Sequence, residues 1–298
     1  MKVLLIGNIK TSGDDEDYYQ EYAGFFQQVA TKTKIDFALT YLHNLYIEVG
    51  EGAFRIYDTK TQTELKDYDI VILRGKGFRG MFDVLRTVSL YGQTNNIRVI
   101  NDYQKYYEPS KLSQMSELYV NGFPIIKTVY LNDSLLTAQE LPFEFPCIMK
   151  DVYGAHGEDN YLVESFEEIK RILKNSPKTR FILQRFVSNE GDYRVLIAGQ
   201  NHLVIKRYAK GRTHLNNTSQ GGTAELVDEL SDKILKRCHK IAQNFDMDFA
   251  GVDIIIDKNT GEHFCLEVNS QPQVMTGAFS DKKVDLVVNF FENLNRSW

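Results

Sequence analysis

Three oxygen-bearing side chains near the end of the chain could together hold a divalent metal. Asp253 interrupts the apolar run GVDIII, and Glu267 and Asn269 lie two residues apart in CLEVNS. Residues two apart on a strand share one face, and Asp253 can face them from a partner strand. Such oxygen ligands suit Mg2+. The alternative is the polar outer face of an ordinary hairpin, although an acid among valine and isoleucine needs a partner or a metal.

A lysine beside a glycine-bearing loop is a candidate for binding phosphate. Lys150 ends the run PCIMK, and the loop that follows contains Gly154 and Gly157. An ammonium group at a strand end suits a polyphosphate, and glycine lets backbone N–H groups approach it. The alternative is an exposed lysine before a hairpin turn, and the segment is not a GxxxxGK[ST] loop. Lys111, at the start of a predicted helix, is a weaker candidate for the same role.

Basic residues also gather on two segments that are predicted to pair. Arg194 lies in the first and Arg207 in the second. Two guanidinium groups near a metal and a phosphate could clamp a transferring phosphoryl group or a carboxylate. The neighbouring Lys210 and Arg212 are expected to be solvated charges.

The first hundred residues alternate apolar runs with helical stretches. Strands are predicted at 3–7, 35–40, 69–74 and 98–101, with helices at 18–31 and 82–91 and a hairpin at 45–57. This alternation predicts a parallel sheet in a first α/β domain, residues 1–105.

The pattern changes after residue 105. A helix at 110–120 precedes a small mixed sheet, predicted from strands at 125–131, 147–150, 161–163 and 181–186 around a helix at 166–173. Two hairpins follow, at 193–208 and 249–268, with helices at about 229–244 and 283–294. We therefore expect a central subdomain at 106–187 and a C-terminal α+β subdomain at 188–298.

Bulk properties exclude several classes of protein. The 298 residues are too many for one core, and a net charge of -5 gives no electrostatic reason to expect nucleic acid or an anionic membrane as partner. No apolar segment is long enough to span a bilayer or to serve as a signal peptide. The three scattered cysteines give no disulfide framework, and a cytoplasmic protein is expected.

The ordered segments resemble the ATP-grasp superfamily, and within it the RimK-like branch of the ribosomal-protein glutamate ligase and its relatives. The resemblance extends from about residue 69 onward. It is carried by KLSQMSELYVNGFPI, PCIMKDVYGAHG, FILQRFV, GDYRVLIAG, IKRYAKGRTHLNNTSQGG, FAGVDII and CLEVNSQP. Each fragment is weak alone, whereas their shared order and spacing are specific.

The resemblance implies an ATP-grasp fold after a preliminary parallel-sheet domain, with ATP bound between the last two subdomains. The residues that would contact ATP are Lys111, Lys150, Gly154, Gly157, Gln184, Arg185, Phe186, Val187 and Asp192. Those that would face the phosphoryl group and the acyl substrate are Arg194, Arg207 and Asn217. Two Mg2+ ions, or Mn2+ in their place, would be held by Asp253, Glu267 and Asn269.

The activity implied by the resemblance is an ATP-dependent carboxylate–amine ligase that forms an acyl phosphate from an amino acid, a peptide or a protein terminus. A kinase of the same fold and a non-catalytic ATP-binding module are the alternatives. Arg74 would face the substrate, and a homodimer or homotetramer is expected by analogy. Departures from the family pattern, such as Arg185 in place of a glutamate and Leu215-Asn216-Asn217 in place of R-S-N, leave the acceptor unidentified.

Overall fold

The computed structural model describes residues 1–8, 14–74, 81–102, 110–154, 159–209, 222–228, 230–275 and 277–295. The N-terminal part is built on a parallel sheet with the strand order β2-β1-β6-β7. Its strands are β1 (Lys2–Gly7), β2 (Asp36–Tyr41), β6 (Ile70–Leu73) and β7 (Arg98–Ile100). β1 is apolar along almost its whole length because both of its faces are covered. Val3 and Leu5 pack toward α1 (Asp14–Thr33), and Leu4 and Ile6 toward α2 (Phe82–Thr94).

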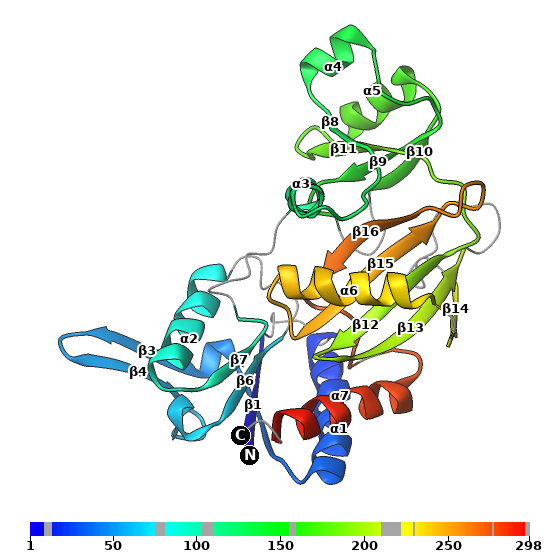
Figure 1. Ribbon diagram of the computed structural model, residues 1–298. Helices are drawn as coiled ribbons and strands as arrows, with labels where there is room; N and C mark the ends of the chain where they lie inside the picture. The colour runs from blue at the N-terminus through cyan, green and yellow to red at the C-terminus, as the bar shows by residue number, and fades with distance from the viewer. Residues whose placement is uncertain are drawn as a thin grey trace.

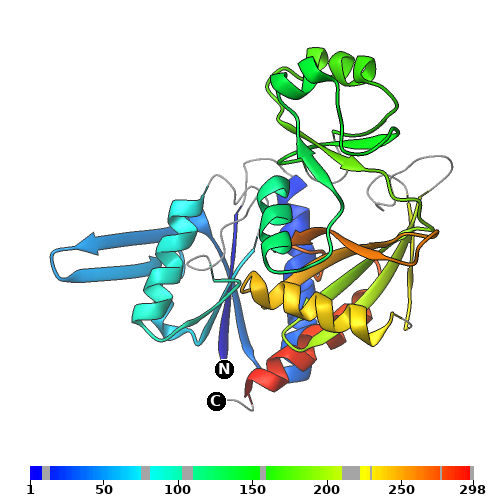
Figure 2. The ribbon, with the colours of Figure 1, turned by 45° about the horizontal axis from the view of Figure 1, so that its top comes forward.

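A small antiparallel sheet extends from this domain, as Figures 1 and 2 show. It consists of β3 (Leu45–Gly50), β4 (Ala53–Asp58) and β5 (Thr63–Glu64), next to the 3-10 helices η1 (Leu42–Asn44) and η2 (Leu65–Asp67). The predicted hairpin at 45–57 is confirmed, and it turns at Glu51 and Gly52, both of which have positive φ.

The central part carries a four-stranded sheet in the order β10-β9-β11-β8. Its elements are β8 (Thr128–Tyr130), α4 (Asp133–Ala138), β9 (Cys147–Asp151), β10 (Asn160–Val163), α5 (Phe166–Asn175) and β11 (Phe181–Arg185). The sequence predicted the four strands and α5 but not α4, a six-residue helix with no buried side chain. Its Leu135 and Leu136 pack, partly buried, on the central core, but six residues are too few to show a helical period in the sequence. The predicted strand at 125–131 is observed only at 128–130: Lys127 and Leu131 each share one backbone hydrogen bond with β11, whereas Ile125 bridges Cys265 of the C-terminal part.

The C-terminal part is an antiparallel sheet in the order β14-β13-β12-β15-β16. Its strands are β12 (Asp192–Ala198), β13 (Asn201–Tyr208), β14 (Thr223–Leu226), β15 (Phe249–Ile256) and β16 (His263–Asn269). Both predicted hairpins are confirmed, whereas β14 was not predicted. One face is covered by α6 (Asp232–Asn244) and by α3 (Lys111–Val120), whose Met115 and Leu118 pack into the same core.

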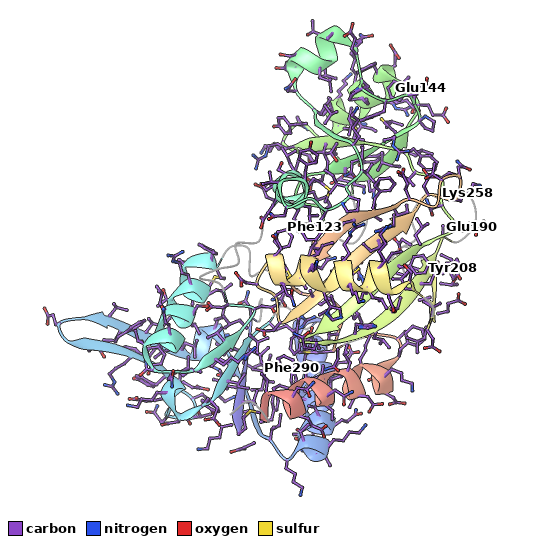
Figure 3. The ribbon with its side chains drawn as sticks, viewed as in Figure 1. Phe123, Glu144, Glu190, Tyr208, Lys258 and Phe290 are labelled. Carbon is purple, nitrogen blue, oxygen red and sulfur yellow. The ribbon has the colours of Figure 1, made fainter. Side chains whose placement is uncertain are left out.

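The opposite face of this sheet shares a core with the N-terminal domain. Helix α7 (Ser280–Asn295) runs beside α1 beneath the sheet (Figure 1), and one cluster joins Val3 of β1, Leu196 of β12 and Phe290 of α7. Phe290, labelled in Figure 3, packs on Phe249 with ring centroids 4.8 Å apart. The last helix therefore fixes the first domain against the C-terminal sheet. No helix in the described ranges is both long and apolar enough to cross a membrane.

Candidate functional site

The strand register of the C-terminal sheet brings five of the predicted site residues onto one face. Asp253 of β15 lies opposite Arg194 of β12 on one side and opposite Glu267 of β16 on the other. Two residues before Arg194 on β12, Asp192 lies opposite Arg207 of β13. Side chains directly opposite each other in a sheet share a face. Three acids and two arginines are thus placed side by side.

A β-bulge gives Glu267 its direction. The register shifts after Asp253, so that Ile254 pairs with Cys265 and Leu266 is the extra residue. In a regular strand Cys265 and Glu267 would share a face. With the bulge, Cys265 packs with Ile254 in the core under α6, and Glu267 faces the site beside Asp253. Bulges commonly re-aim a side chain in this way.

Asp253 is held by two guanidinium groups. Arg194 donates from Nε to Oδ1 and from Nη2 to Oδ2, each at 2.7 Å, and Arg207 Nη2 lies 3.0 Å from Oδ2. Burial alone would raise the pKa of Asp253, but Arg194 and Arg207 outweigh it and lower the pKa to about 2. The carboxylate is therefore ionised at neutral pH.

Asp192 and Arg207 form a buried pair beside it. Arg207 Nε donates to Asp192 Oδ1 at 2.6 Å, and both side chains are less than one-tenth exposed. Burial opposes the charge of Arg207, but Asp253 and Asp192 outweigh it and raise the guanidinium pKa. Burial raises the pKa of Asp192, against the attraction of Arg207. Asp192, predicted to hold a ribose, thus has one oxygen committed to Arg207.

Two lysines face these carboxylates from outside the C-terminal sheet. Lys111, at the start of α3, has its Nζ 3.7 Å from Glu267 Oε1 and donates to the carbonyl of Gly154. Burial lowers the pKa of Lys150, on β9, to about 8; the charge of Glu267 opposes this shift and that of Lys111 adds to it. The predicted phosphate-binding lysines therefore lie with the predicted metal-binding acids, where the central and C-terminal sheets meet (Figure 2).

The strand predicted to line adenine has its side chains engaged within the protein. Gln184 is buried and donates to Thr128 Oγ1 at 2.9 Å, and its Oε1 has no partner in the described part of the chain. Arg185 lies over the ring of Phe264, with Asp257 Oδ2 3.7 Å away. Phe186 is half-buried, and Val187 packs in the small apolar cluster of Ile126 and Ile255.

Two predicted site residues, Gly157 and Asn217, lie outside the described residues, as do Lys210 and Arg212. Arg74, predicted to face the substrate, is buried and donates from Nε to the Tyr22 hydroxyl at 2.6 Å and from Nη2 to the carbonyl of Pro272. It therefore connects the end of β6 to the segment that follows β16.

Two positioning residues were not predicted. Gln114, one turn after Lys111, donates to the Val268 carbonyl at 2.7 Å and accepts from the Val268 N–H at 3.0 Å. It fixes α3 on β16, and with it Lys111 beside Glu267. Lys283 of α7 is buried, and burial lowers its pKa to about 8, with the charges of Arg194 and Arg74 adding to the shift. Neither residue could be predicted, because the sequence does not show that a glutamine or a lysine on an amphipathic helix is buried.

Known proteins resemble this chain in sequence and in fold. A model of the RimK-like ATP-grasp domain matches residues 111–294. The chain is 25% identical over 134 residues to the uncharacterized protein MG012 homolog of Mycoplasma pneumoniae, covering 44% of this chain and 46% of that protein. It thus spans about half the length of that relative. It is also 22% identical over 228 residues to the coenzyme gamma-F420-2:alpha-L-glutamate ligase of Methanocaldococcus jannaschii, covering 69% of this chain and 77% of that protein.

Similarity to a solved structure extends over nearly the whole chain. The ATP-grasp ligase PsnB, solved with the precursor peptide PsnA2 and AMPPNP, superposes with a TM-score of 0.68 at 16% identity, covering 97% of this chain and 98% of that one. The predicted fold, a parallel-sheet domain followed by the two sheets of an ATP-grasp unit, is confirmed.

Proposed function

Since the chain belongs to the RimK-like ATP-grasp family, we propose that it is an ATP-dependent ligase that joins a carboxylate to an amine through an acyl phosphate. One observation carries the proposal: Lys111 and Lys150 meet Asp253 and Glu267 where two sheets come together. Cations for phosphate and oxygen ligands for a metal are thus within reach of one nucleotide.

The residues present fit Mg2+. Asp253 and Glu267 are directly paired, and Asn269, two residues on, has a buried amide nitrogen without a partner among the described residues. Rotating that amide would place its carbonyl oxygen there instead. No group of three or more His, Cys, Asp or Glu side chains that could hold a metal is found in the described ranges. Two carboxylates and an amide suit an ion that keeps water and phosphate as its other ligands.

The contacts with Arg194 and Arg207 limit how many bonds Asp253 can make to a metal ion. A carboxylate offers about four lone-pair sites, and Arg194 and Arg207 occupy three of those on Asp253. Asp253 can then give one contact to a metal, and Glu267, which is one-third exposed, is the more open ligand. When bound, Mg2+ would neutralise phosphate charge.

The protein's own groups then perform the transfer. Lys111 and Lys150 bind the phosphates, and Arg207 offsets the charge that develops when the substrate carboxylate attacks the γ-phosphate. Asp192 holds Arg207 in place for this step. The amine then displaces phosphate from the acyl phosphate, which gives an amide, ADP and phosphate. The role of Arg194 is to orient Asp253 and to face the acyl group.

A peptide or an amino acid is the proposed substrate. PsnB, the solved neighbour, was determined with a precursor peptide, which supports a peptide substrate for this chain. The test is ADP release with Mg2+ and ATP across a panel of amino acids and peptides, followed by mass measurement of the product. An amide with free phosphate supports the proposal. A phosphorylated acceptor, or no ATP turnover over a broad panel, contradicts it.

A further inference from the structure

The small sheet of the N-terminal domain has an open edge. Its strand order is β3-β4-β5, so β3 pairs with β4 on one side and with no strand of the described ranges on the other. Figures 1 and 2 show the β3–β4 hairpin projecting away from the rest of the molecule. Strand β3 (LYIEVG) contains no lysine or proline, and its register with β4 has no bulge, so it lacks the usual features that prevent pairing at an edge. This edge can therefore accept another strand.

The turn of the hairpin determines which backbone groups face this edge. Glu51 and Gly52 form a two-residue turn with φ values of +47° and +86°, between the paired residues Gly50 and Ala53. In such hairpins the pair next to the turn is hydrogen-bonded, and hydrogen-bonded pairs then alternate with non-hydrogen-bonded pairs along the ladder. The residues of β3 in non-hydrogen-bonded pairs, which begin one position before Gly50, therefore direct their N–H and C=O groups away from β4.

The residues that face the open edge are Leu45, Ile47 and Val49. The Leu45 N–H donates to the carbonyl of Leu42, whereas the outward groups of Ile47 and Val49 have no backbone partner among the described residues. The three side chains share one face of the strand. Leu45 and Ile47 pack, partly buried, on the core of the domain, and Val49 is 68% exposed. A strand added here would satisfy the free backbone groups and cover Val49.

The sequence of β3 favours a second copy of itself as the added strand. Antiparallel pairing about Ile47 places Leu45 opposite Val49 of the other copy, so apolar side chains meet. The same register places Glu48 opposite Tyr46, so no like charges meet. Pairing about Glu48 would instead set two carboxylates directly opposite each other, which is destabilising. Pairing about Tyr46 would place Val49 against the 3-10 helix η1 rather than a strand. One register is therefore preferred, as a specific two-fold contact requires.

We propose that β3 binds β3 of a second copy of this chain, antiparallel about Ile47, so that two three-stranded sheets join into one. Ile47 exchanges both of its outward hydrogen bonds with Ile47 of the other copy, and at each end the Val49 N–H donates to the Leu45 carbonyl of the other copy. The two-fold axis passes between the two Ile47 residues. This assembly is independent of the proposed function, because no residue of the proposed mechanism lies on β3.

Sedimentation velocity tests the assembly. The wild-type protein should form a dimer at or below about 100 µM, a concentration that detects even a weak specific contact. V49K places a charge against Leu45 of the other copy and should weaken the dimer at least about tenfold. V120K is the matched control, because Val120 is 82% exposed on α3, away from the hairpin. V49P is a second variant: it removes an outward N–H that the ladder with β4 does not use, so the fold should persist while the dimer loses a bond at each end.

Cysteine variants test the register. Opposite residues in a hydrogen-bonded pair have Cα atoms about 5.5 Å apart, within reach of a disulfide, so I47C should cross-link two chains on mild oxidation. The two copies of Glu48 are diagonal neighbours about 7–8 Å apart in the same register, so E48C should cross-link much more slowly. The native Cys147, Cys238 and Cys265 are buried and should not interfere.

Three outcomes overturn the proposal: a wild-type monomer at about 100 µM, a dimer that V49K and V49P leave unchanged, or faster cross-linking in E48C than in I47C. K111M, which is expected to lose affinity for ADP, should remain a dimer. A failure of nucleotide binding and a failure of the assembly are therefore distinguished.

Discussion

Arg194 and Asp253 face each other across β12 and β15, and their side chains share two hydrogen bonds of 2.7 Å. Parallel double contacts between guanidinium and carboxylate fix both groups in direction. Asp253 also contacts Arg207, which in turn holds Asp192. The two arginines and two acids therefore form one connected unit, so a change in one affects the others.

The first prediction concerns the charge of Asp253. D253N should abolish ADP formation, because the arginines lose their shared anion and the metal loses a ligand. It should also lower the free energy of unfolding by about 3 kcal/mol, the cost typical of breaking a buried ion pair. Chemical denaturation checks the second effect. D285N is the control: Asp285 pairs with Lys32 on the surface and should cost less than about 1 kcal/mol.

The second prediction concerns the metal. E267Q should raise the Mg2+ concentration needed for half-maximal ADP release by about tenfold or more, since Glu267 is the more exposed of the paired acids. EDTA should abolish turnover, and excess Mg2+ should restore it. A titration identical to that of the wild-type protein would remove Glu267 from the metal site.

The third prediction concerns the lysines at the meeting of the two sheets. K111M and K150M should each weaken ADP binding by about tenfold to a hundredfold, the range for a lost hydrogen bond to a charged group. Calorimetric titration with ADP measures this loss. K174M, at an exposed site on α5 of the same subdomain, should bind ADP as the wild-type protein does.

The fourth prediction is a pH dependence. Burial lowers the pKa of Lys150 from 10.5 to about 8, so between these values the unfolded chain holds a proton that the folded chain has released. Lys150 therefore reduces stability below pH 8, and this cost disappears as the pH rises toward 10.5. Phosphate needs the charged form, so ADP affinity should fall above pH 8, by up to about tenfold per pH unit. K150M should show no such fall, and a fall retained in K150M would contradict the assignment.

The fifth prediction concerns a glycine beside the Asp192–Arg207 pair. Gly191 has a φ of +105°, and an added Cβ would overlap the carbonyl oxygen of Arg207. G191A should therefore displace β13 at Arg207 and lower both activity and melting temperature. Gly261 also has a positive φ, +72°, but open space around its Cβ position. G261A carries only backbone strain, about 1–2 kcal/mol, so equal losses in the two variants would contradict a steric role for Gly191.

The sequence was sufficient to predict the helices and strands whose apolar residues recur with a clear period. The apolar runs of β1 and β6 predicted buried parallel strands, and the hairpin at 249–268 correctly placed Asp253 opposite Glu267. The four-residue β14 and the six-residue α4 were missed because each is too short to show a period in the sequence, although Leu226 of β14 and Leu135 of α4 pack, partly buried, against the cores. Helix α3, predicted with the central segment, contacts β8 of the central sheet and also packs on β16 of the C-terminal sheet, a second contact that an apolar stripe alone does not specify.

The sequence by itself determined the types of group that the site needs and their family order: two lysines, two arginines, and acids on one hairpin. Tertiary structure alone decided their partners. The Arg194–Asp253 contact depends on β12 pairing with β15, across 59 residues of chain. The charges of Arg74 and Arg194 act on Lys283 only because α7 packs beside α1 under the sheet. Local periodicity encodes which residues share a face, whereas contacts between distant elements arise from the packing of whole faces, which no single segment specifies.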